Sequence, residues 1–396
     1  MANSNLGDAK KAKNDEFYTQ YHDIEKEMNA YLDYDADVFR NKTILLPCDD
    51  PEWSNFTRYF AQNFEKLGIK KLISTSYAPN SKPKTLNQQP TLFEMESPQF
   101  DGEKTASNGK IFTIENDNTG DNKIDVEDLQ WKYLEGDGDF RSDEITALRD
   151  EADVIVTNPP FSLFRNFLNW IVEADKQFVI IGNMNAITYK EVFPLIKESR
   201  MWLGATNFNI GMYFRVPDGF VYAPTYKFER TQGGESVNRV PGVCWFTNFE
   251  HGRRHQPLPL MTEAENIKFS KHDAVKGVGY QKYDNYDAIE VPFTSGIPSD
   301  FEGVMGVPIS FLDKYNPEQF EILGMCENGD LYDLKTKVYS SAQCKQAYQD
   351  KFGKPGTYDM NASGVVRKEG ILEKVYQRIL ISHKQGKPIN SGPNNG

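Results

Sequence analysis

Short apolar runs alternate with amphipathic stretches through the first 200 residues of the chain. Residues 43–47 (TILLP) are predicted to form a buried strand, and residues 71–75 (KLIST) a second strand. Between them, residues 54–67 place aromatic and apolar side chains on one helical face, and Gly68 then ends the pattern. A strand, a helix and a strand in this order predict two parallel strands joined by a crossover helix.

The same alternation continues after residue 150. Residues 153–157 and 178–181 are apolar runs, residues 163–172 carry an apolar helical face, and a further helix is expected over residues 188–199. Alternating strands and helices are typical of an α/β fold with a Rossmann-like, doubly wound sheet. Ligands of such sheets bind at the carboxyl ends of the strands, so the residues that directly follow each strand are the first candidates for a site.

Two segments depart from this alternation. Residues 79–128 are rich in Asn, Ser, Pro, Thr, Asp and Gly without sustained periodicity, which predicts an irregular acidic insertion. Beyond residue 202 the pattern becomes β-rich and then loop-rich. We therefore expect one domain over residues 1–250 and a separate C-terminal module over residues 251–396.

Composition excludes several classes of protein. A chain of 396 residues with 39% hydrophobic residues can build a sizeable core, which excludes global disorder. No apolar run approaches the roughly 20 residues of a membrane span, the N-terminus has no apolar signal segment, and the four cysteines show no C-x-x-C spacing. Residues 117–125 resemble a calcium loop, but Asn122 and Val126 occupy the positions of its hydrophobic residue and its final Glu. We expect a cytoplasmic protein without a bound metal.

The net charge of −12 argues at first against a nucleic-acid partner, because phosphate contacts need Lys and Arg. However, residues 96–151 contain 16 acidic and 6 basic residues, whereas residues 200–280 contain 7 and 10, and residues 345–387 contain 4 and 9. The C-terminal half therefore keeps cations that could bind DNA, although each one alone is more often a solvated charge. The candidates are Arg215, Lys227, Arg230, Arg239, Arg253 and Arg254, with Lys368, Lys374 and Arg378 further on.

The clearest chemical signal is Asn158-Pro159-Pro160-Phe161, directly after the predicted strand 153–157. An exocyclic amine on an aromatic base is a poor nucleophile, since its lone pair is delocalised into the ring. The Asn158 side-chain oxygen and the Pro159 carbonyl could accept its two N–H groups and localise that lone pair, while Phe161 could stack on the base. The alternative is a stiff turn after a strand, with no chemistry.

This tetrad resembles the fourth motif of S-adenosylmethionine-dependent amino-methyltransferases, and the chain is similar to the EcoRI-type adenine-specific DNA modification methyltransferases. The resemblance covers most of the chain. It rests on residues 15–20 (DEFYTQ), 48–51 (CDDP), 54–56 (SNF), 136–142 (GDGDFRS), 158–165 (NPPFSLFR), 187–193 (ITYKEVF), 283–287 (YDNYD), 303–308 (GVMGVP) and 316–320 (NPEQF).

The resemblance implies a set of positions for S-adenosylmethionine. One motif would close over the methionine part of the cofactor, a second would bind its ammonium or ribose hydroxyls, and a third would accept its adenine amino group and cover the ring. These are Phe17, Tyr18 and Thr19; Cys48, Asp49 and Asp50; and Asp139 and Phe140, with Asn158 at the methyl group. The alternatives are core anchors for the first motif, a solvated turn for the second and an acidic helix-capping turn for the third.

The resemblance also leaves gaps. The glycine-rich loop of most methyltransferases is absent, and the second strand ends without the acidic residue that normally holds the ribose, so no ribose ligand is assigned. No G-x-G-x-x-G or phosphate-loop pattern favours another nucleotide cofactor.

The function that the resemblance implies is site-specific methylation of adenine N6 in duplex DNA. The adenine would be flipped out to reach Asn158, and the C-terminal module would recognise the target sequence, for which GAATTC is only a family-level expectation. We expect a monomer, with a restriction endonuclease as a functional partner that shares the site without binding the protein. The alternatives are an RNA or protein-glutamine N-methyltransferase and a DNA-binding homologue that has lost catalysis.

Overall fold

The computed structural model describes residues 18–48, 54–78, 95, 97–206, 208, 210–215, 228–230 and 236–384. The chain divides into two compact units, Met1–Gly252 and Arg253–Gly396. What each unit contributes to function stays a prediction.

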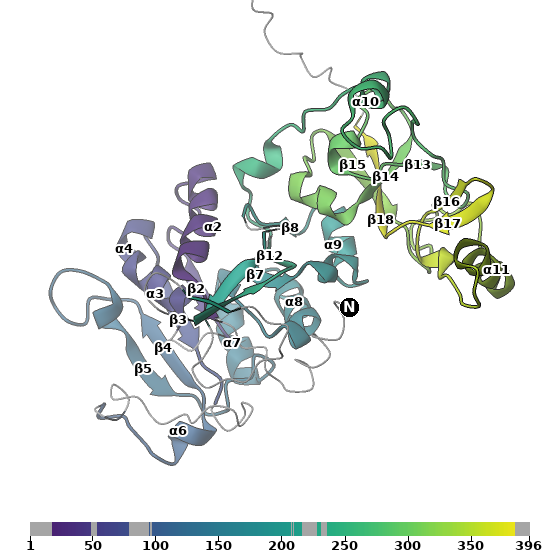
Figure 1. The fold of residues 1–396 in the computed structure, drawn as a ribbon. Coiled ribbons are helices and arrows are strands. Elements are labelled where there is room, and N and C mark those ends of the chain that lie inside the picture. Colours follow the sequence, from purple (N-terminus) through teal and green to yellow (C-terminus); the bar gives the residue numbers. More distant parts are fainter. Residues whose placement is uncertain are drawn as a thin grey trace, which may run out of the picture. The chain divides into compact units, whose positions relative to one another are not determined.

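The first unit is built on a mixed eight-stranded sheet (Figure 1). Strands β2, β3, β6 and β7 are parallel, whereas the outer strands β4, β5 and β12 run antiparallel to their neighbours. The parallel pairing of β2 with β3 confirms the predicted strand, helix and strand order. In spatial order the strands are β5 (Gln130–Tyr133), β4 (Lys110–Ile114), β3 (Lys71–Thr75), β2 (Thr43–Leu46), β6 (Val154–Thr157), β7 (Gln177–Asn183), β12 (Val243–Thr247) and β8 (Trp202–Leu203).

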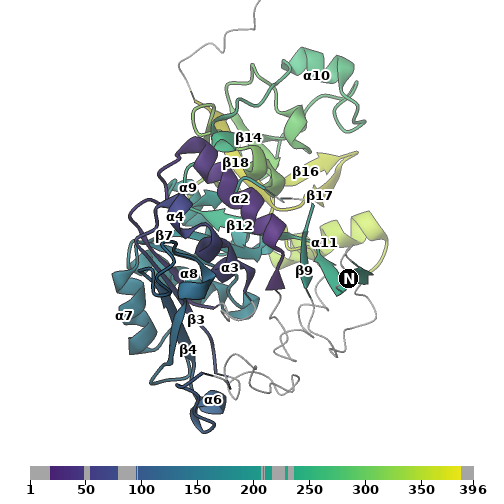
Figure 2. The same ribbon diagram turned by 90° about the vertical axis from the view of Figure 1, so that its left-hand side faces the viewer.

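Helices cover both faces of this sheet, as a Rossmann-like fold requires. Helices α2, α3 and α4 lie on one side and α7 and α8 on the other, and Figure 2 shows α2 and α3 in front of the strands (Figures 1 and 2). The first layer packs on alternate residues of the parallel strands, such as Ile44, Val154 and Val179. On the opposite face the Phe164 ring of α8 lies 5.2 Å from that of Phe246. The helices of this unit are α2 (Tyr21–Tyr34), α3 (Asn55–Gln62), α4 (Phe64–Leu67), α6 (Lys104–Ser107), α7 (Asp143–Glu151), α8 (Phe164–Glu173) and α9 (Phe193–Lys197).

Local sequence explains where these helices begin and end. The Ser54 hydroxyl accepts hydrogen bonds from the first amides of α3, and Gly68 ends α4 in the left-handed conformation. The helix predicted between them is divided at Asn63 into α3 and α4. The helix predicted over residues 188–199 is shorter, since only Phe193–Lys197 forms α9, after a 3-10 helix at Met184–Thr188.

The prediction of an irregular insertion over residues 79–128 was wrong for its centre. Strand β4 lies between β3 and β5 in the sheet, and Ile111, Phe112 and Ile114 are buried. Only three of the five residues of β4 are apolar, which is too weak a signal to stand out in a polar segment. The part that follows β4 is a loop closed by its own acids: the Asp128 carboxylate accepts hydrogen bonds from three backbone amides, and the Asp117 carboxylate from two.

A second, four-stranded sheet joins the two ends of the first unit. Its order is β1 (Tyr18–Thr19), β9 (Met212–Arg215), β11 (Ser236–Val240) and β10 (Phe228–Arg230), all paired antiparallel. Nearby, the buried Glu27 carboxylate of α2 accepts hydrogen bonds from the Tyr31 hydroxyl (2.5 Å), the Ala205 amide (2.8 Å) and the Thr206 hydroxyl. Burial raises the pKa of Glu27. These bonds fix the segment that leads into β9.

The second unit has its own sheet and core. Strand β13 pairs parallel with β14, and β18 pairs antiparallel with β14 and β15. Its elements are β13 (Ala288–Glu290), β14 (Val304–Pro308), β15 (Phe320–Met325), β18 (Arg378–His383), the hairpin of β16 (Val365–Lys368) and β17 (Ile371–Lys374), and helices α10 (Glu263–Phe269) and α11 (Ser341–Phe352).

Candidate active site

The carboxyl ends of the four parallel strands lie at one edge of the main sheet. Residues 47–48, 76–78, 158–161 and 184–188 follow these strands. The ends of β2 and β3 are directly joined, because the Thr75 hydroxyl donates a hydrogen bond to the Pro47 carbonyl (3.2 Å). This is the edge at which sheets of this type bind their ligands, and two of the predicted motifs follow one of these strands, Cys48 after β2 and the Asn158-Pro-Pro-Phe tetrad after β6.

The Asn158-Pro-Pro-Phe turn leaves β6 in a fixed conformation. Thr157 and Pro159 are buried, Asn158 is half-buried, and Pro160 adopts φ −54° and ψ 122°. The Leu163 amide donates to the Pro160 carbonyl (2.9 Å), which begins the 3-10 helix Phe161–Leu163. Phe161 packs partly on the core that underlies the strands, so its ring is supported without being enclosed.

The turn that holds Asp139 lies against the end of β3. The Ala78 amide donates to the Asp137 carbonyl (2.7 Å). Gly138 has φ +83°, and a Cβ atom there would overlap the Ser76 carbonyl oxygen, so only glycine fits. The structure therefore places the Asp139 turn beside the strand that, in this fold, borders a bound nucleoside.

Asp139 and Phe140 face different surroundings. The Asp139 carboxylate forms a two-pronged ion pair with Arg141, with Nε–Oδ1 2.9 Å and Nη2–Oδ2 2.5 Å. Hydrogen bonding to Arg141 lowers the pKa of Asp139, so the group is an anion able to accept further hydrogen bonds. Phe140 is buried, with its ring 5.1 Å from Phe167 and 5.6 Å from Trp170. Its contact with a cofactor stays a prediction.

The N-terminal motif also reaches this edge. The Asn55 side chain, at the start of α3, donates to the Thr19 carbonyl (2.7 Å), which holds β1 beside the first turn of α3. The Thr19 hydroxyl is buried, and among the described residues it has no hydrogen-bond partner. Cys48 is half-buried, and Tyr18 is described only by its backbone. Phe17, Asp49 and Asp50 lie outside the described residues.

Several predicted DNA contacts are engaged within the protein. The Arg239 guanidinium donates to the Ile210 carbonyl (2.7 Å) and that of Arg253 to Asp313 (2.5 Å). Arg254 and Arg378, two further candidates, are buried, which leaves little of either side chain exposed to a DNA phosphate. The burial of these two arginines depends on tertiary packing, which a count of charged residues along the sequence does not reveal.

The other cationic candidates differ in what can be said of them. Arg215 and Arg230 lie in β9 and β10, with only their backbones described, and Lys227 lies outside the described residues. Lys368 and Lys374 are exposed on β16 and β17. Within the described residues no group of three or more His, Cys, Asp or Glu could hold a metal, and no helix is long and apolar enough to cross a membrane.

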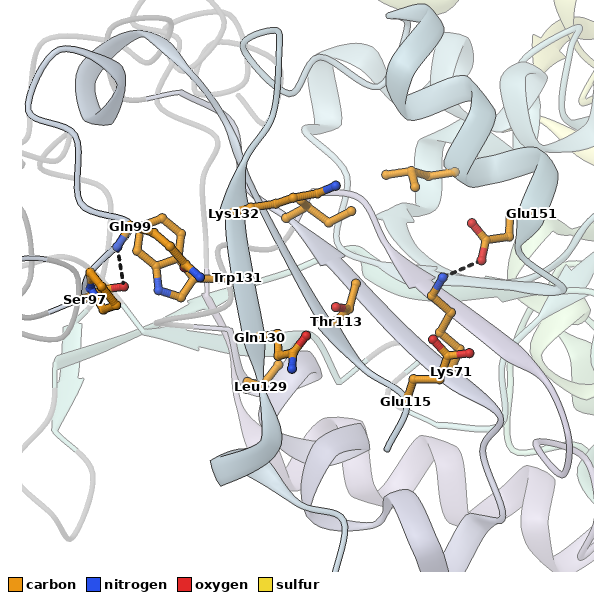
Figure 3. A pocket seen from close by; sticks show the side chains of 13 residues that line it. Lys71, Ser97, Gln99, Thr113, Glu115, Leu129, Gln130, Trp131, Lys132 and Glu151 are labelled. Carbon is orange, nitrogen blue, oxygen red and sulfur yellow. Dashed lines mark hydrogen bonds and ion pairs between the residues drawn. The ribbon is translucent and has the colours of Figure 1, made fainter. Parts of the chain in front are cut away.

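A groove of about 1000 Å³ lies elsewhere, along β3, β4 and β5 (Figure 3). Lys71 and Glu151 form an ion pair of 2.7 Å at one end, and Trp131 and Gln99 lie at the other. None of the predicted site residues lines it.

Comparison with known proteins decides the family. The family model described as adenine-specific methyltransferase EcoRI matches residues 5–384. The chain belongs to this family. It is 42% identical to the type II methyltransferase M.EcoRI of Escherichia coli over 337 residues, which cover 84% of this chain and 92% of that protein. It is 35% identical to the type II methyltransferase M.MpnI of Mycoplasma pneumoniae over 334 residues, which cover 84% and 89%. No solved structure matches the chain.

Family membership confirms the resemblance that the motifs indicated and makes this chain an adenine-specific methyltransferase. A methyltransferase needs a methyl donor, and the Rossmann-like sheet offers the edge described above. Sequence reasoning missed Glu27, whose hydrogen bonds to residues 205 and 206 exist only in the folded chain. It also assigned no role to Arg165, which ends the motif over residues 158–165.

Proposed function

We propose that the chain transfers a methyl group from S-adenosylmethionine to N6 of an adenine that is flipped out of duplex DNA. The observation that carries this proposal is the fixed Asn158-Pro-Pro-Phe turn at the carboxyl end of β6, in a chain of an adenine-specific methyltransferase family. The type II methyltransferases named above support DNA as the substrate.

The turn suits an amino group as nucleophile. The Asn158 side-chain oxygen and the Pro159 carbonyl are acceptors for the two N–H groups, and accepting both favours a tetrahedral nitrogen with a localised lone pair. The prolines hold these acceptors in place and contribute no N–H donor of their own. No strong base is required, because the nitrogen becomes acidic once it is methylated.

Phe161 supports the base. Its ring rests partly on the core, which fixes its orientation, and a half-buried aromatic ring offers a face for stacking. Stacking of a base on an aromatic side chain is worth about 1–3 kcal/mol. The adenine amino group is paired inside the duplex, so the base must leave the helix before it can reach Asn158.

The residues beside β2 and β3 fit a nucleoside donor with an amino-acid tail. The Thr19 hydroxyl is a buried hydrogen-bonding group that a ligand at this edge would satisfy, and the Asp139 anion keeps acceptor sites besides those that Arg141 occupies. S-adenosylmethionine supplies an electrophilic methyl group. Thr19 and Asp139 bind and orient the donor, and Asn158 orients the acceptor.

The test is methyl transfer with tritiated S-adenosylmethionine to duplex DNA, RNA and protein in parallel. We expect label only in DNA, recovered as N6-methyladenine after nuclease digestion, and none with Asn158→Ala. Label in RNA or in protein glutamine would replace the substrate that we propose. Donor binding without transfer to any substrate would indicate a homologue that has lost catalysis.

We propose further that the enzyme acts as a monomer, which sedimentation with and without DNA would test. Sequencing of methylated DNA from cells that express it would give the recognition sequence. A dimer at catalytic concentrations would contradict the first statement without affecting the chemistry.

A further inference from the structure

Arg165 presents an exposed, oriented guanidinium close to the Asn158-Pro-Pro-Phe turn. It lies in the first turn of α8, which begins where the 3-10 helix Phe161–Leu163 ends. Its guanidinium carbon is 5.3 Å from the centre of the Tyr189 ring, and its Nη1 is 3.8 Å from Glu191 Oε1. The side chain remains 56% exposed.

The N–H donors of this guanidinium are available. A separation of 3.8 Å is an ion pair but is too long for a hydrogen bond. In the part of the chain that the structure describes, the Arg165 side chain makes no hydrogen bond. By contrast, Arg239 and Arg253 donate to groups of the protein. Arg165 is therefore held in place without having its donors used.

Its position is at the carboxyl edge of the sheet. The Phe164 ring occupies the space where a Cβ atom of Gly182 would lie, so the first turn of α8 packs directly on the end of β7. Tyr189 and Glu191 follow the 3-10 helix Met184–Thr188 that leaves β7. The chain thus brings a cation from beyond β6 and its supports from beyond β7 to the same place.

The sheet order separates this place from the donor positions. Strands β3, β2, β6 and β7 are consecutive neighbours. Thr19 and Asp139 lie beside the ends of β2 and β3, whereas Arg165 and Tyr189 lie beside β6 and β7. An anion bound by Arg165 therefore approaches from the substrate side of Asn158.

We propose that Arg165, positioned by Tyr189 and Glu191, binds a backbone phosphate of the DNA strand that carries the target adenine. The planar fork of N–H donors matches a phosphate, and a phosphate contact near the extruded nucleotide fixes the strand while the base is held at Asn158. The proposal rests on the proposed function, since it assumes a DNA substrate.

The structure supplies a matched control in Arg200. Its side chain is 51% exposed and its Nη1 lies 3.8 Å from Glu198 Oε2, so its exposure and its ion pair are nearly those of Arg165. Arg200 lies just before β8. Strand β8 is antiparallel to β12, and β12 is antiparallel to β7, so β8 runs in the same direction as β7. Arg200 is therefore at the amino edge of the sheet, opposite to the edge where Arg165 lies. No aromatic contact of its side chain is found among the described residues.

The experiment compares Arg165→Met with Arg200→Met in the full chain. Binding of a fluorescent, unmethylated duplex that contains the sequence methylated by the enzyme is measured across a salt series. Binding of S-adenosylmethionine is measured by calorimetry. Arg165→Met should weaken DNA binding about tenfold or more, as expected for a lost hydrogen-bonded charge, and should reduce the slope of log K against log salt by about 0.9. Its donor affinity and the DNA binding of Arg200→Met should equal those of the wild type.

Tyr189 gives a second readout that separates positioning from mere structure. Tyr189→Leu should weaken DNA binding while leaving the salt slope unchanged, because the Arg165 charge remains. Tyr189→Phe should bind DNA as the wild type does, because the ring face that holds the guanidinium remains. Equal DNA binding by the two arginine variants would overturn the inference. So would loss of donor affinity alone in Arg165→Met, which would assign the guanidinium to the donor carboxylate. Failure of the wild type to methylate DNA would instead refute the proposed function.

Discussion

Arg378 allows a prediction whose size can be worked out from the structure. Its guanidinium donates to both oxygens of Glu290, with distances of 2.6 to 3.1 Å, and the two side chains are only 8% and 10% exposed. The Tyr283 hydroxyl also donates to Glu290, and the pair lies where β18 and β13 flank β14. Arg378→Met removes the charge, keeps similar length and leaves Glu290 buried with one neutral donor.

Removing one partner of a buried ion pair costs about 3–5 kcal/mol, because the remaining charge is left without compensation. Removing both costs far less, since no charge stays buried. In the double variant Glu290→Leu/Arg378→Met the main loss is the partner of the Tyr283 hydroxyl, worth about 1–3 kcal/mol. The second substitution should therefore recover about 2 kcal/mol of the free energy of unfolding, the difference between the middles of the two ranges. Substituting an exposed arginine that binds phosphate would instead lower the free energy of unfolding by less than about 1 kcal/mol.

Native-state hydrogen exchange followed by mass spectrometry is the suitable assay. All five tryptophans precede residue 253, so their fluorescence reports on the first unit and not on this pair. Amides of β14 and β18 in Arg378→Met should exchange about a hundredfold faster or more, the equivalent of the lower end of the cost. Peptides of the first unit serve as the internal control and should be unchanged.

Two results would refute this reasoning. Unchanged protection of β14 and β18 in Arg378→Met would show that the pair is not buried as described. A double variant less stable than Arg378→Met would show that Glu290 is stabilised by something other than the lost guanidinium.

Four further changes in the site and the sheet have definite expected outcomes. Asn158→Ala should abolish methyl transfer while retaining donor and DNA binding, and wild-type turnover by this variant would refute the mechanism. Phe161→Ala should weaken retention of the flipped base by about 1–3 kcal/mol, which should lower 2-aminopurine fluorescence at the target position. Arg141→Ala should raise the pKa of the Asp139 carboxyl, because the guanidinium that lowers it is lost. The Asp139–Arg141 ion pair stabilises the fold above the ordinary pKa of the carboxyl, and this contribution is lost as the pH falls. The variant should therefore lose less stability on acidification than the wild type. A carbon-13 NMR titration that shows the same Asp139 pKa in both proteins would contradict this prediction. Replacing residues 82–127 by a Gly/Ser linker should abolish the cooperative fold, because it removes β4 from between β3 and β5. Circular dichroism and methylation assays test this, and a folded, active product would show that β4 is dispensable.

The sequence by itself determined the elements that bury a whole face. Strands β2, β3, β6 and β7 and helices α3 and α8 follow from apolar patterns that are contained within a few consecutive residues. The place of Asn158 directly after β6 followed in the same way, and with the other motifs it indicated the family. These features depend on local sequence, so local patterns predicted them.

Tertiary structure alone decided the features that depend on distant partners. Strand β4 is recognisable only through its pairing with β3 and β5, and the two residues of β1 only through β9. Arg378 and Glu290 are 88 residues apart, and their burial turned an apparent DNA contact into a core ion pair. Arg165 is the opposite case, since Tyr189 and Glu191, which follow the 3-10 helix after β7, orient it and leave its donors available. A charge count cannot separate the two arginines, because burial and partner geometry are properties of the folded chain.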